Sequence, residues 1–337
     1  MKTVLITGAG GEVGYTLTAE LKKEGYKVVA LSLHNLPPEQ TKITDVFYRG
    51  DVSDYKFVEK IFDKHEIEVV FHLASILSTG GERNPELAIT VNAVGTQNTM
   101  EVATKKSLET GKSVKFIFPS SIAAYGIPDL KEKSKKPKVK EEDFTSPITI
   151  YGVTKLYAEN LGLYFSKHYK LLDDLDRSNL IDFRCVRFPG LLSPDTLPSG
   201  GTSDYGPEMF HSAAQGKPYA CFVRPDSTIP FMAMEDGVRV LMLLAKAPKK
   251  DIKSSIYNVS GFSASAKDIE KEIKHLFPKA EITYKIHMLR QRIIDSWPAD
   301  VDDSKAQKEW GWKPKYNFKK TFEGYLLPKI KERYGIK

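Results

Sequence analysis

The chain has 337 residues, of which 41% are hydrophobic and 28% are charged, and its formal net charge is +7. This length and composition fit one large globular α/β domain with a smaller lobe. They exclude a membrane protein, because no apolar run approaches the ~20 residues of a membrane span. The first residues also lack the apolar core of a signal peptide, so we expect a cytoplasmic protein.

Cysteine and histidine give no sign of a metal centre. Cys185 and Cys221 both lie in apolar surroundings, which predicts two buried free thiols. The seven histidines are scattered and form no pair with metal-ligand spacing. We therefore expect no metal site.

The first half alternates short β-branched runs with amphipathic stretches. Strands are predicted at Thr3–Ala9, Lys27–Leu33, Val46–Val52, Glu68–Ala74 and Lys115–Ser121. Helices are predicted at Val13–Glu24, from Asp54 as an N-cap, and at Glu86–Thr110. Nearly continuous apolar strands separated by helices indicate an α/β fold of the Rossmann type, a doubly wound parallel sheet covered on both faces.

The pattern changes in the second half. A helix at Tyr151–Tyr169 and a strand at Phe183–Pro189 are followed by a Pro-, Ser- and Gly-rich loop, Ser193–Gly206, and by short elements. We expect residues 1–182 to form the dinucleotide-binding domain with the catalytic residues. Residues 183–337 should be mainly a smaller C-terminal substrate-binding lobe, with the chain crossing back to the sheet.

A lysine-rich run, Lys131–Lys140, carries much of the positive charge. It is interpreted as a solvated loop. A nucleic-acid patch is the alternative, but no aromatic residues interleave the lysines and no nucleic-acid motif follows. We therefore expect neither a nucleic acid nor a membrane as a partner.

A glycine-rich motif, TGAGGEVG, joins the first predicted strand to the first predicted helix. Gly8, Gly11 and Gly14 allow a tight turn and close approach of the backbone to a pyrophosphate at the helix N-terminus. An acid at the end of the second strand would favour NAD, but Ser32 stands there, followed by His34. NAD is expected and NADP stays open. Asp51 suits the adenine amine, with a loop acid or helix cap as the alternative.

Ser121, Tyr151 and Lys155 form the candidate catalytic set. Ser121 ends the fifth strand, and Tyr151 and Lys155 are four residues apart at a helix start, on one face. A nearby ammonium is expected to lower the Tyr151 pKa from ~10, so that the phenolate accepts a proton from a substrate hydroxyl. Ser121 can hydrogen-bond the same substrate oxygen.

With Asn92, the motifs TGAGGEVG, DV, HLAS, SSIAAYG and YGVTK resemble the extended short-chain dehydrogenase/reductase family over the whole chain. The resemblance implies that Ser121 orients the substrate, that Tyr151 is the acid/base and that Lys155 also holds the nicotinamide ribose. It implies a homodimer built on the two long helices. The implied cofactor contacts are Gly8, Gly11, Glu12, Val13, Gly14, Ser32, Asp51, Val52, Leu73, Ala74, Ser75, Asn92, Tyr151, Lys155 and Pro189.

The second half bears on the substrate. Pro189-Gly190 replaces the Asn usual in nucleotide-sugar members, and Arg187 is the only nearby cation before the loop, whereas a diphosphate needs several. The stretches RFPGLLS, SGGTSDY, YACFV, IDSWP and DDSKAQKEWGW resemble the threonine-oxidising group of the family. That resemblance implies an L-threonine 3-hydroxyl as substrate, contacted by Ser78, Ser121, Tyr151, Gly201, Thr202 and Trp297.

Three alternatives stay open at this point. The same catalytic set serves nucleotide-sugar epimerases, and a dehydrogenase of another small hydroxy acid fits as well. A non-catalytic NAD(P)-binding regulator is the third, but it would not need all three residues of the catalytic set. Ordinary loop hydrogen bonding is the alternative role for Ser78 and Thr202, and packing is the alternative for Trp297.

Overall fold

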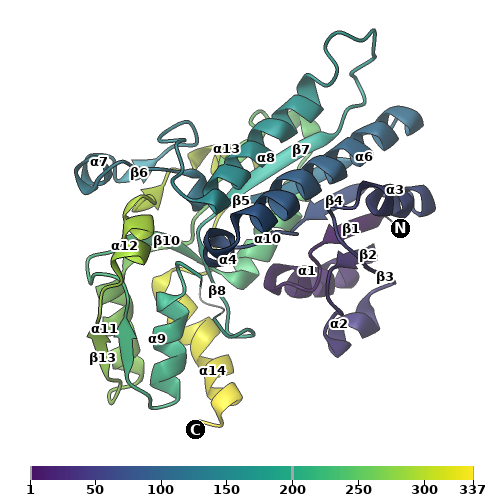
Figure 1. The fold of residues 1–337 in the computed structure, drawn as a ribbon. Coiled ribbons are helices and arrows are strands. Elements are labelled where there is room, and N and C mark those ends of the chain that lie inside the picture. Colours follow the sequence, from purple (N-terminus) through teal and green to yellow (C-terminus); the bar gives the residue numbers. More distant parts are fainter. Residues whose placement is uncertain (1, 199–200, 337) are drawn as a thin grey trace.

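A seven-stranded parallel sheet forms the centre of the molecule in the computed structural model, which describes residues 2–198 and 201–336 (Figure 1). The strand order is β11-β7-β5-β4-β1-β2-β3, and every pairing in this sheet is parallel. The strands are β1 (Thr3–Thr7), β2 (Lys27–Ser32), β3 (Val46–Arg49), β4 (Val69–His72), β5 (Lys115–Ser121), β7 (Asp182–Phe188) and β11 (Ile256–Asn258).

Both faces of this sheet are buried, as the continuous apolar strands require. Along β1, Val4 and Ile6 pack into one core cluster and Leu5 into the other, because successive side chains point to opposite faces. Helices cover both clusters, namely α1 (Glu12–Lys23) and α10 (Met234–Lys246) on one face, and α3 (Tyr55–Lys64), α6 (Gly95–Thr110) and α8 (Ile150–Lys167) on the other. The predicted doubly wound α/β fold is confirmed.

Several strands end earlier than the sequence predicts. Ala9, Leu33, Gly50–Val52 and Leu73–Ala74 lie in loops just beyond β1, β2, β3 and β4. These loops lie at the edge of the sheet where the carboxyl ends of parallel strands meet, which is where ligands bind in such folds.

The predicted helix Glu86–Thr110 has three parts, α5 (Pro85–Ala88), a π-helical segment η1 (Ile89–Val94) and α6. A π-helix has hydrogen bonds five residues apart and occurs mostly as a short bulge inside an α-helix, often at a functional site. Asn92 lies inside η1 and is buried.

The second half also contributes small sheets and helices at one end of the large sheet (Figure 1). The strands are β8 (Gly190–Leu192), β10 (Thr228–Ala233) and β12 (Phe262–Ser265) in one small sheet, and β9 (Tyr219–Cys221) with β13 (Ile282–Tyr284) in another. The helices there include α9 (Tyr205–Ala214), α11 (Ala266–Leu276), α12 (Met288–Asp295) and α14 (Leu327–Tyr334), whereas α13 (Ser304–Trp310) packs beside β11 of the large sheet. Ser199 and Gly200 of the predicted loop lie outside the described residues.

The lysine-rich run is not a loop, which corrects the prediction, although most of its side chains are exposed as a solvated segment requires. It forms α7 (Leu130–Lys135) and β6 (Lys138–Val139), and β6 pairs in parallel with β14 (Asp300–Val301). Asp129 caps α7 by accepting a hydrogen bond from the Glu132 amide. Lys133 is only 7% exposed and donates to the Ile294 carbonyl. One lysine of this charged run is therefore buried, and its hydrogen-bond partner, the Ile294 carbonyl, is distant in sequence.

Cys185 and Cys221 are both free and buried, as predicted. Among the helices of the described residues, none is long and apolar enough to cross a membrane.

Candidate active site

The loop between β1 and α1 has the geometry of a phosphate-binding turn. Gly8 has φ +67°, in the left-handed region, and a Cβ at this position would lie 2.5 Å from the Ala74 amide nitrogen. Gly11 is the N-cap of α1, so the first turn of the helix points its free N–H groups toward the loop. This arrangement fits the pyrophosphate of a dinucleotide.

Two cavities lie on either side of the glycine loop and share Gly8, Gly11, Leu73 and Ser75. The first has a volume of about 290 Å³ and reaches toward the C-terminal lobe. The second has a volume of about 320 Å³ and follows the ends of β2 and β3. An extended ligand bound across the loop would occupy both, with its phosphates at the N-terminus of α1.

The structure brings nearly all predicted contact residues to these cavities. The first is lined by Gly8, Gly11, Glu12, Val13, Gly14, Leu73, Ser75, Pro189 and by all six predicted substrate residues, Ser78, Ser121, Tyr151, Gly201, Thr202 and Trp297, together with Lys155. The second is lined by Ser32, Asp51, Val52 and Ala74 in addition to the shared residues.

Asn92 is the exception, because it does not line either cavity. Its amide oxygen accepts from the Ile76 N–H at 2.7 Å, and its amide nitrogen donates to the Ile76 carbonyl and to Thr154. Asn92 thus joins the loop after β4 to α8. It shapes the cavity wall from behind.

The catalytic candidates converge because α8 begins very close to the end of β5. A Cβ on Gly152 would lie 2.0 Å from the Ala123 carbonyl oxygen, so only glycine permits this approach. Thr149 caps the helix by accepting from the Gly152 amide. Tyr151 then lies against Ser121 and is hydrogen-bonded to it, and Ser121 Oγ accepts from the Ala123 amide at 3.1 Å.

Lys155 follows one turn later on α8 and is buried. Its Nζ donates to the Pro119 carbonyl at 2.8 Å and lies 5.5 Å from the centre of the Tyr151 ring. Burial lowers the Lys155 pKa to about 8, since a charged ammonium loses its hydration there.

The expectation that Lys155 lowers the Tyr151 pKa is wrong for this arrangement. Burial of the phenol raises its pKa to about 12, and only the hydrogen bond with Ser121 opposes that shift. Desolvation of the phenolate outweighs an ammonium that is itself held by the Pro119 carbonyl. In this structure Tyr151 is therefore protonated at neutral pH.

Small polar groups surround the other end of the first cavity. Ser78 Oγ and Thr202 Oγ1 lie 3.0 Å apart, and both side chains are buried. The Gly201 N–H donates to Asp204 at 2.6 Å, so a substrate carboxylate would compete with Asp204 for this donor. Trp297 is 5% exposed and forms an apolar wall.

Glu12 at the start of α1 connects the glycine loop to the loop after β8. Its carboxylate accepts a hydrogen bond from Thr196, and burial raises its pKa. The second half of the chain thereby covers the N-terminus of α1.

Behind the cavity, a buried ion pair ties α8 to the sheet. Arg187 of β7 donates to both Glu159 carboxylate oxygens, at 2.8 and 2.6 Å, and the two side chains are 2% and 1% exposed. Ser120 donates to the same carboxylate at 2.5 Å. Arg187 also donates to the Glu141 carbonyl at 2.7 Å.

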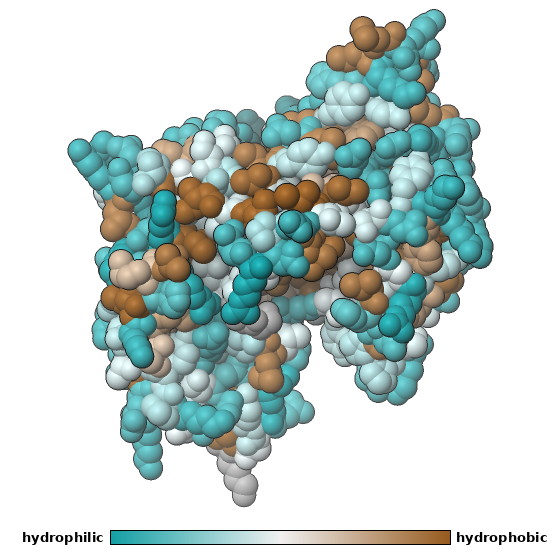
Figure 2. All heavy atoms as spheres, in the orientation of Figure 1, coloured by the Kyte–Doolittle hydropathy of each residue, from teal (hydrophilic) through white to brown (hydrophobic). Residues whose placement is uncertain are grey.

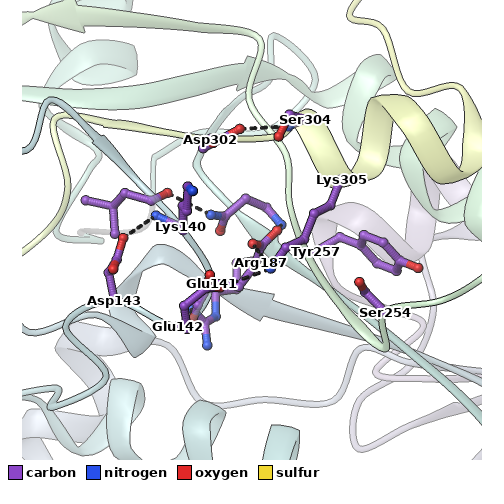
Figure 3. A network of polar contacts seen from close by, with 12 residues as sticks. Lys140, Glu141, Glu142, Asp143, Arg187, Ser254, Tyr257, Asp302, Ser304 and Lys305 are labelled. Atoms are coloured by element: carbon purple, nitrogen blue, oxygen red, sulfur yellow. Dashed lines mark hydrogen bonds and ion pairs between the residues drawn. The ribbon is translucent and has the colours of Figure 1, made fainter.

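Figure 3 shows how this network continues toward the C-terminal lobe. The Glu141 carboxylate accepts from the Asn258 backbone N–H at 2.9 Å and pairs with Lys305 at 2.9 Å. All of these Arg187 contacts are to other parts of the protein, so its guanidinium is not available to bind a diphosphate in the cavity.

Residues 4–260 match the family model described as the NAD dependent epimerase/dehydratase family. The chain belongs to this family. A curated relative, the mitochondrial L-threonine 3-dehydrogenase of Bos taurus, is 35% identical over 311 residues, which cover 92% of this chain and 78% of the relative.

Solved structures of family members agree with this assignment. The L-threonine dehydrogenase of Clostridium difficile has a TM-score of 0.87 at 32% identity, covering 99% of both chains. A monomeric L-threonine 3-dehydrogenase from a metagenome has a TM-score of 0.84 at 35% identity, covering 98% of this chain and 99% of the other. The protein is accordingly a nicotinamide-dependent oxidoreductase of the epimerase/dehydratase family.

Sequence reasoning missed several residues of this family member's site. Leu77 and Leu191 line the first cavity, and Glu159 sets the position of α8. Glu159 lies on the same helix, eight residues after Tyr151 and four after Lys155. This spacing indicates that the three side chains share one buried face of the helix. Leu77 and Leu191 follow motif residues but carry no chemical signal of their own.

Glu159→Gln should leave the Arg187 charge buried without a carboxylate. We expect the free energy of unfolding to fall by about 3–5 kcal/mol in urea denaturation, because one member of a buried ion pair is removed. Glu159→Gln combined with Arg187→Met should recover much of the loss. Glu39→Gln, at an exposed pair with Lys42, is the control and should change little. Equal losses in Glu159→Gln and Glu39→Gln would contradict this role for the buried pair.

Proposed function

We propose that the protein oxidises the 3-hydroxyl of L-threonine to 2-amino-3-ketobutyrate, with NAD as the cofactor. The main support is the convergence of Ser121, Tyr151 and Lys155 on a cavity that also contains the glycine loop. The relatives named as L-threonine dehydrogenases at 32–35% identity favour this substrate over other hydroxy acids.

In the proposed reaction the hydrogen on threonine C3 leaves as a hydride, with the electron pair of the C3–H bond. The hydroxyl O–H bond also breaks, and a C=O double bond forms at C3. A nicotinamide bound in the first cavity would supply the acceptor for the hydride. Tyr151, as phenolate, takes the hydroxyl proton. Ser121 holds the substrate oxygen next to Tyr151, oriented by the Ala123 amide. Lys155, whose Nζ lies 5.5 Å from the centre of the Tyr151 ring, would hold the cofactor ribose.

Recognition of an amino acid fits the other end of the cavity. Ser78, Gly201 and Thr202 offer hydroxyl and backbone groups to the carboxylate and ammonium, and Trp297 excludes water from one side. Among the described residues that line this cavity, Lys155 is the only basic one. A nucleotide sugar would bring a second diphosphate, for which these groups are poorly suited.

The adenosine end of the cofactor would occupy the second cavity, beside Ser32, His34 and Asp51. We propose NAD because Asp51 and the neutral Ser32 suit an unmodified adenosine. Residues 1–182 would then bind the cofactor, and residues 183–337 would supply most of the substrate lobe. We also propose the cytoplasm as the compartment, since both buried cysteines are free.

The deciding experiment follows nicotinamide absorbance with NAD or NADP and L-threonine, L-serine and a panel of 3-hydroxy acids. We expect L-threonine with NAD to give the largest kcat/KM. Reduction only with another hydroxy acid would replace the substrate, and a larger kcat/KM with NADP would replace the cofactor. No reduction with any of them would favour an epimerase, to be tested with UDP-sugars.

Tyr151→Phe removes only the phenol oxygen and should lower kcat by more than about a hundredfold, because general base catalysis contributes ~10²–10⁴-fold. Cofactor affinity, measured by fluorescence titration, should stay close to that of the wild type. A variant that keeps more than about a hundredth of the wild-type rate would refute Tyr151 as the base.

The wild-type pH profile is a companion measurement. Because the Tyr151 pKa is raised to about 12, the phenolate fraction grows as the pH rises toward that value. The oxidation rate should therefore increase from about pH 7 to about pH 10 in the wild type, with no such rise in Tyr151→Phe.

A homodimer is proposed from the outer faces of α8 and the neighbouring α5–η1 segment. Exposed apolar side chains gather there, and Figure 2 shows a hydrophobic band across this part of the surface. They include Leu87, Ile89, Val94, Val153, Tyr157 and Tyr164. Burying such a stripe against a second copy would remove it from water.

Light scattering on the purified protein should give the mass of two chains, and Val153→Asp should shift it to one chain of 37.9 kDa. The charge would have to be buried in the interface without a partner. Leu172→Asp, at a fully exposed position, is the matched control. A single-chain mass for the wild type, like that of the monomeric metagenome relative, would reject the dimer.

A further inference from the structure

The segment between the catalytic residues Ser121 and Tyr151 also reaches the C-terminal lobe. Within it, residues 127–139 form a strap, which we define as Ile127, α7 and β6. The Ile127 amide donates to the Ser296 carbonyl at 2.9 Å. At the far end of the strap, Val139 pairs with Val301 and its carbonyl accepts from the Asp302 amide. The strap therefore holds residues 294–302 at both ends.

Lys133 makes the middle contact of the strap. Its Nζ donates to the Ile294 carbonyl at 3.0 Å, and the same carbonyl accepts from the Trp297 amide at 3.2 Å. Ile294 lies in the last turn of α12, where carbonyls lack helical partners and a cation is favourable. One oxygen thus joins the buried ammonium to the backbone of the residue that forms a wall of the first cavity.

The surroundings of Lys133 explain how an ammonium is retained there. Burial is the largest influence on its pKa and lowers it, Arg224 acts in the same direction, and Asp295 and Asp226 oppose them, so that the pKa falls to about 8. Arg224 in turn pairs with Asp295 through two contacts of 2.9 Å. Burying a lysine is costly, so this position is unusual in a run whose other lysines lie nearer to solvent.

We propose that Lys133 is a positioning residue for substrate binding, which acts by holding the Ile294 carbonyl and through it Trp297. This proposal rests on the proposed oxidation of L-threonine. Loss of the ammonium would leave the cofactor loop and the catalytic residues in place, because none of them contacts Lys133. It would release the wall of the cavity that closes on the substrate.

Lys133→Met keeps an unbranched apolar stem and removes the donor. We expect the KM for L-threonine to rise about tenfold, as for loss of one charge-assisted hydrogen bond, with kcat changed less than about twofold. The NAD dissociation constant should be unchanged. Lys131→Met, at an exposed position of the same helix, should match the wild type in all three. Lys133→Arg keeps a charged donor, so its KM for L-threonine should lie between the values of Lys133→Met and the wild type.

A double-mutant cycle tests the route through Trp297. If Lys133 acts through this residue, Lys133→Met should raise KM much less in a Trp297→Ala background than in the wild type. Additive effects on KM would overturn the proposal, and so would a KM for Lys133→Met equal to that of Lys131→Met. If Lys133→Met does not fold, Lys133→Gln takes its place in the same comparisons.

Amide hydrogen exchange gives a readout that needs no substrate. Exchange across residues 294–302 should be faster in Lys133→Met than in Lys131→Met, with the sheet strands unchanged. Equal exchange in the two variants would overturn the proposal. Absence of threonine oxidation by the wild type would instead reject the proposed function, and the exchange result would still decide whether Lys133 holds this segment.

Discussion

The buried pair between Glu159 and Arg187 is the contact on which the arrangement of this site depends. It joins α8 to β7, and Ser120 on β5 donates to the same carboxylate. Two charges removed from water lose their hydration, and that loss is compensated only by close, directional contacts. α8 therefore has little freedom to slide or rotate on the sheet. Tyr151 and Lys155 lie two turns and one turn before Glu159 on the same helix. Their positions relative to the sheet are therefore fixed by the same ion pair.

The parallel sheet supplies the second constraint. All its strands end at one edge, so the glycine loop after β1, the loops after β2 and β4, and Ser121 at the end of β5 meet there. The glycine loop and the residues proposed for proton transfer are neighbours for this reason alone. The close approach of α8 to Ala123, which requires Gly152, then brings the phenol to the serine hydroxyl.

The C-terminal half completes the cavity from the other side. Thr202 meets Ser78 across 124 positions of sequence, Thr196 covers Glu12 on α1, and Trp297 forms a wall. The strap and the Glu141 network connect these parts back to the chain between Ser121 and Tyr151. The residues proposed for proton transfer and those proposed for substrate binding are thus linked through one short segment, although they belong to different halves of the chain.

The sequence by itself determined the elements whose signals are local. Alternating apolar runs and helices predicted the doubly wound sheet, and the glycine loop with Ser121, Tyr151 and Lys155 predicted a nicotinamide-linked site, because spacing along one strand or helix dictates which side chains share a face. Tertiary structure alone decided that Lys133 is buried, that Asn92 supports the wall from behind, that Arg187 is consumed by Glu159, and that burial raises the Tyr151 pKa. Each of these features depends on contacts with residues far away in sequence. Such contacts produce no periodic pattern in the sequence, so they could not be predicted from it.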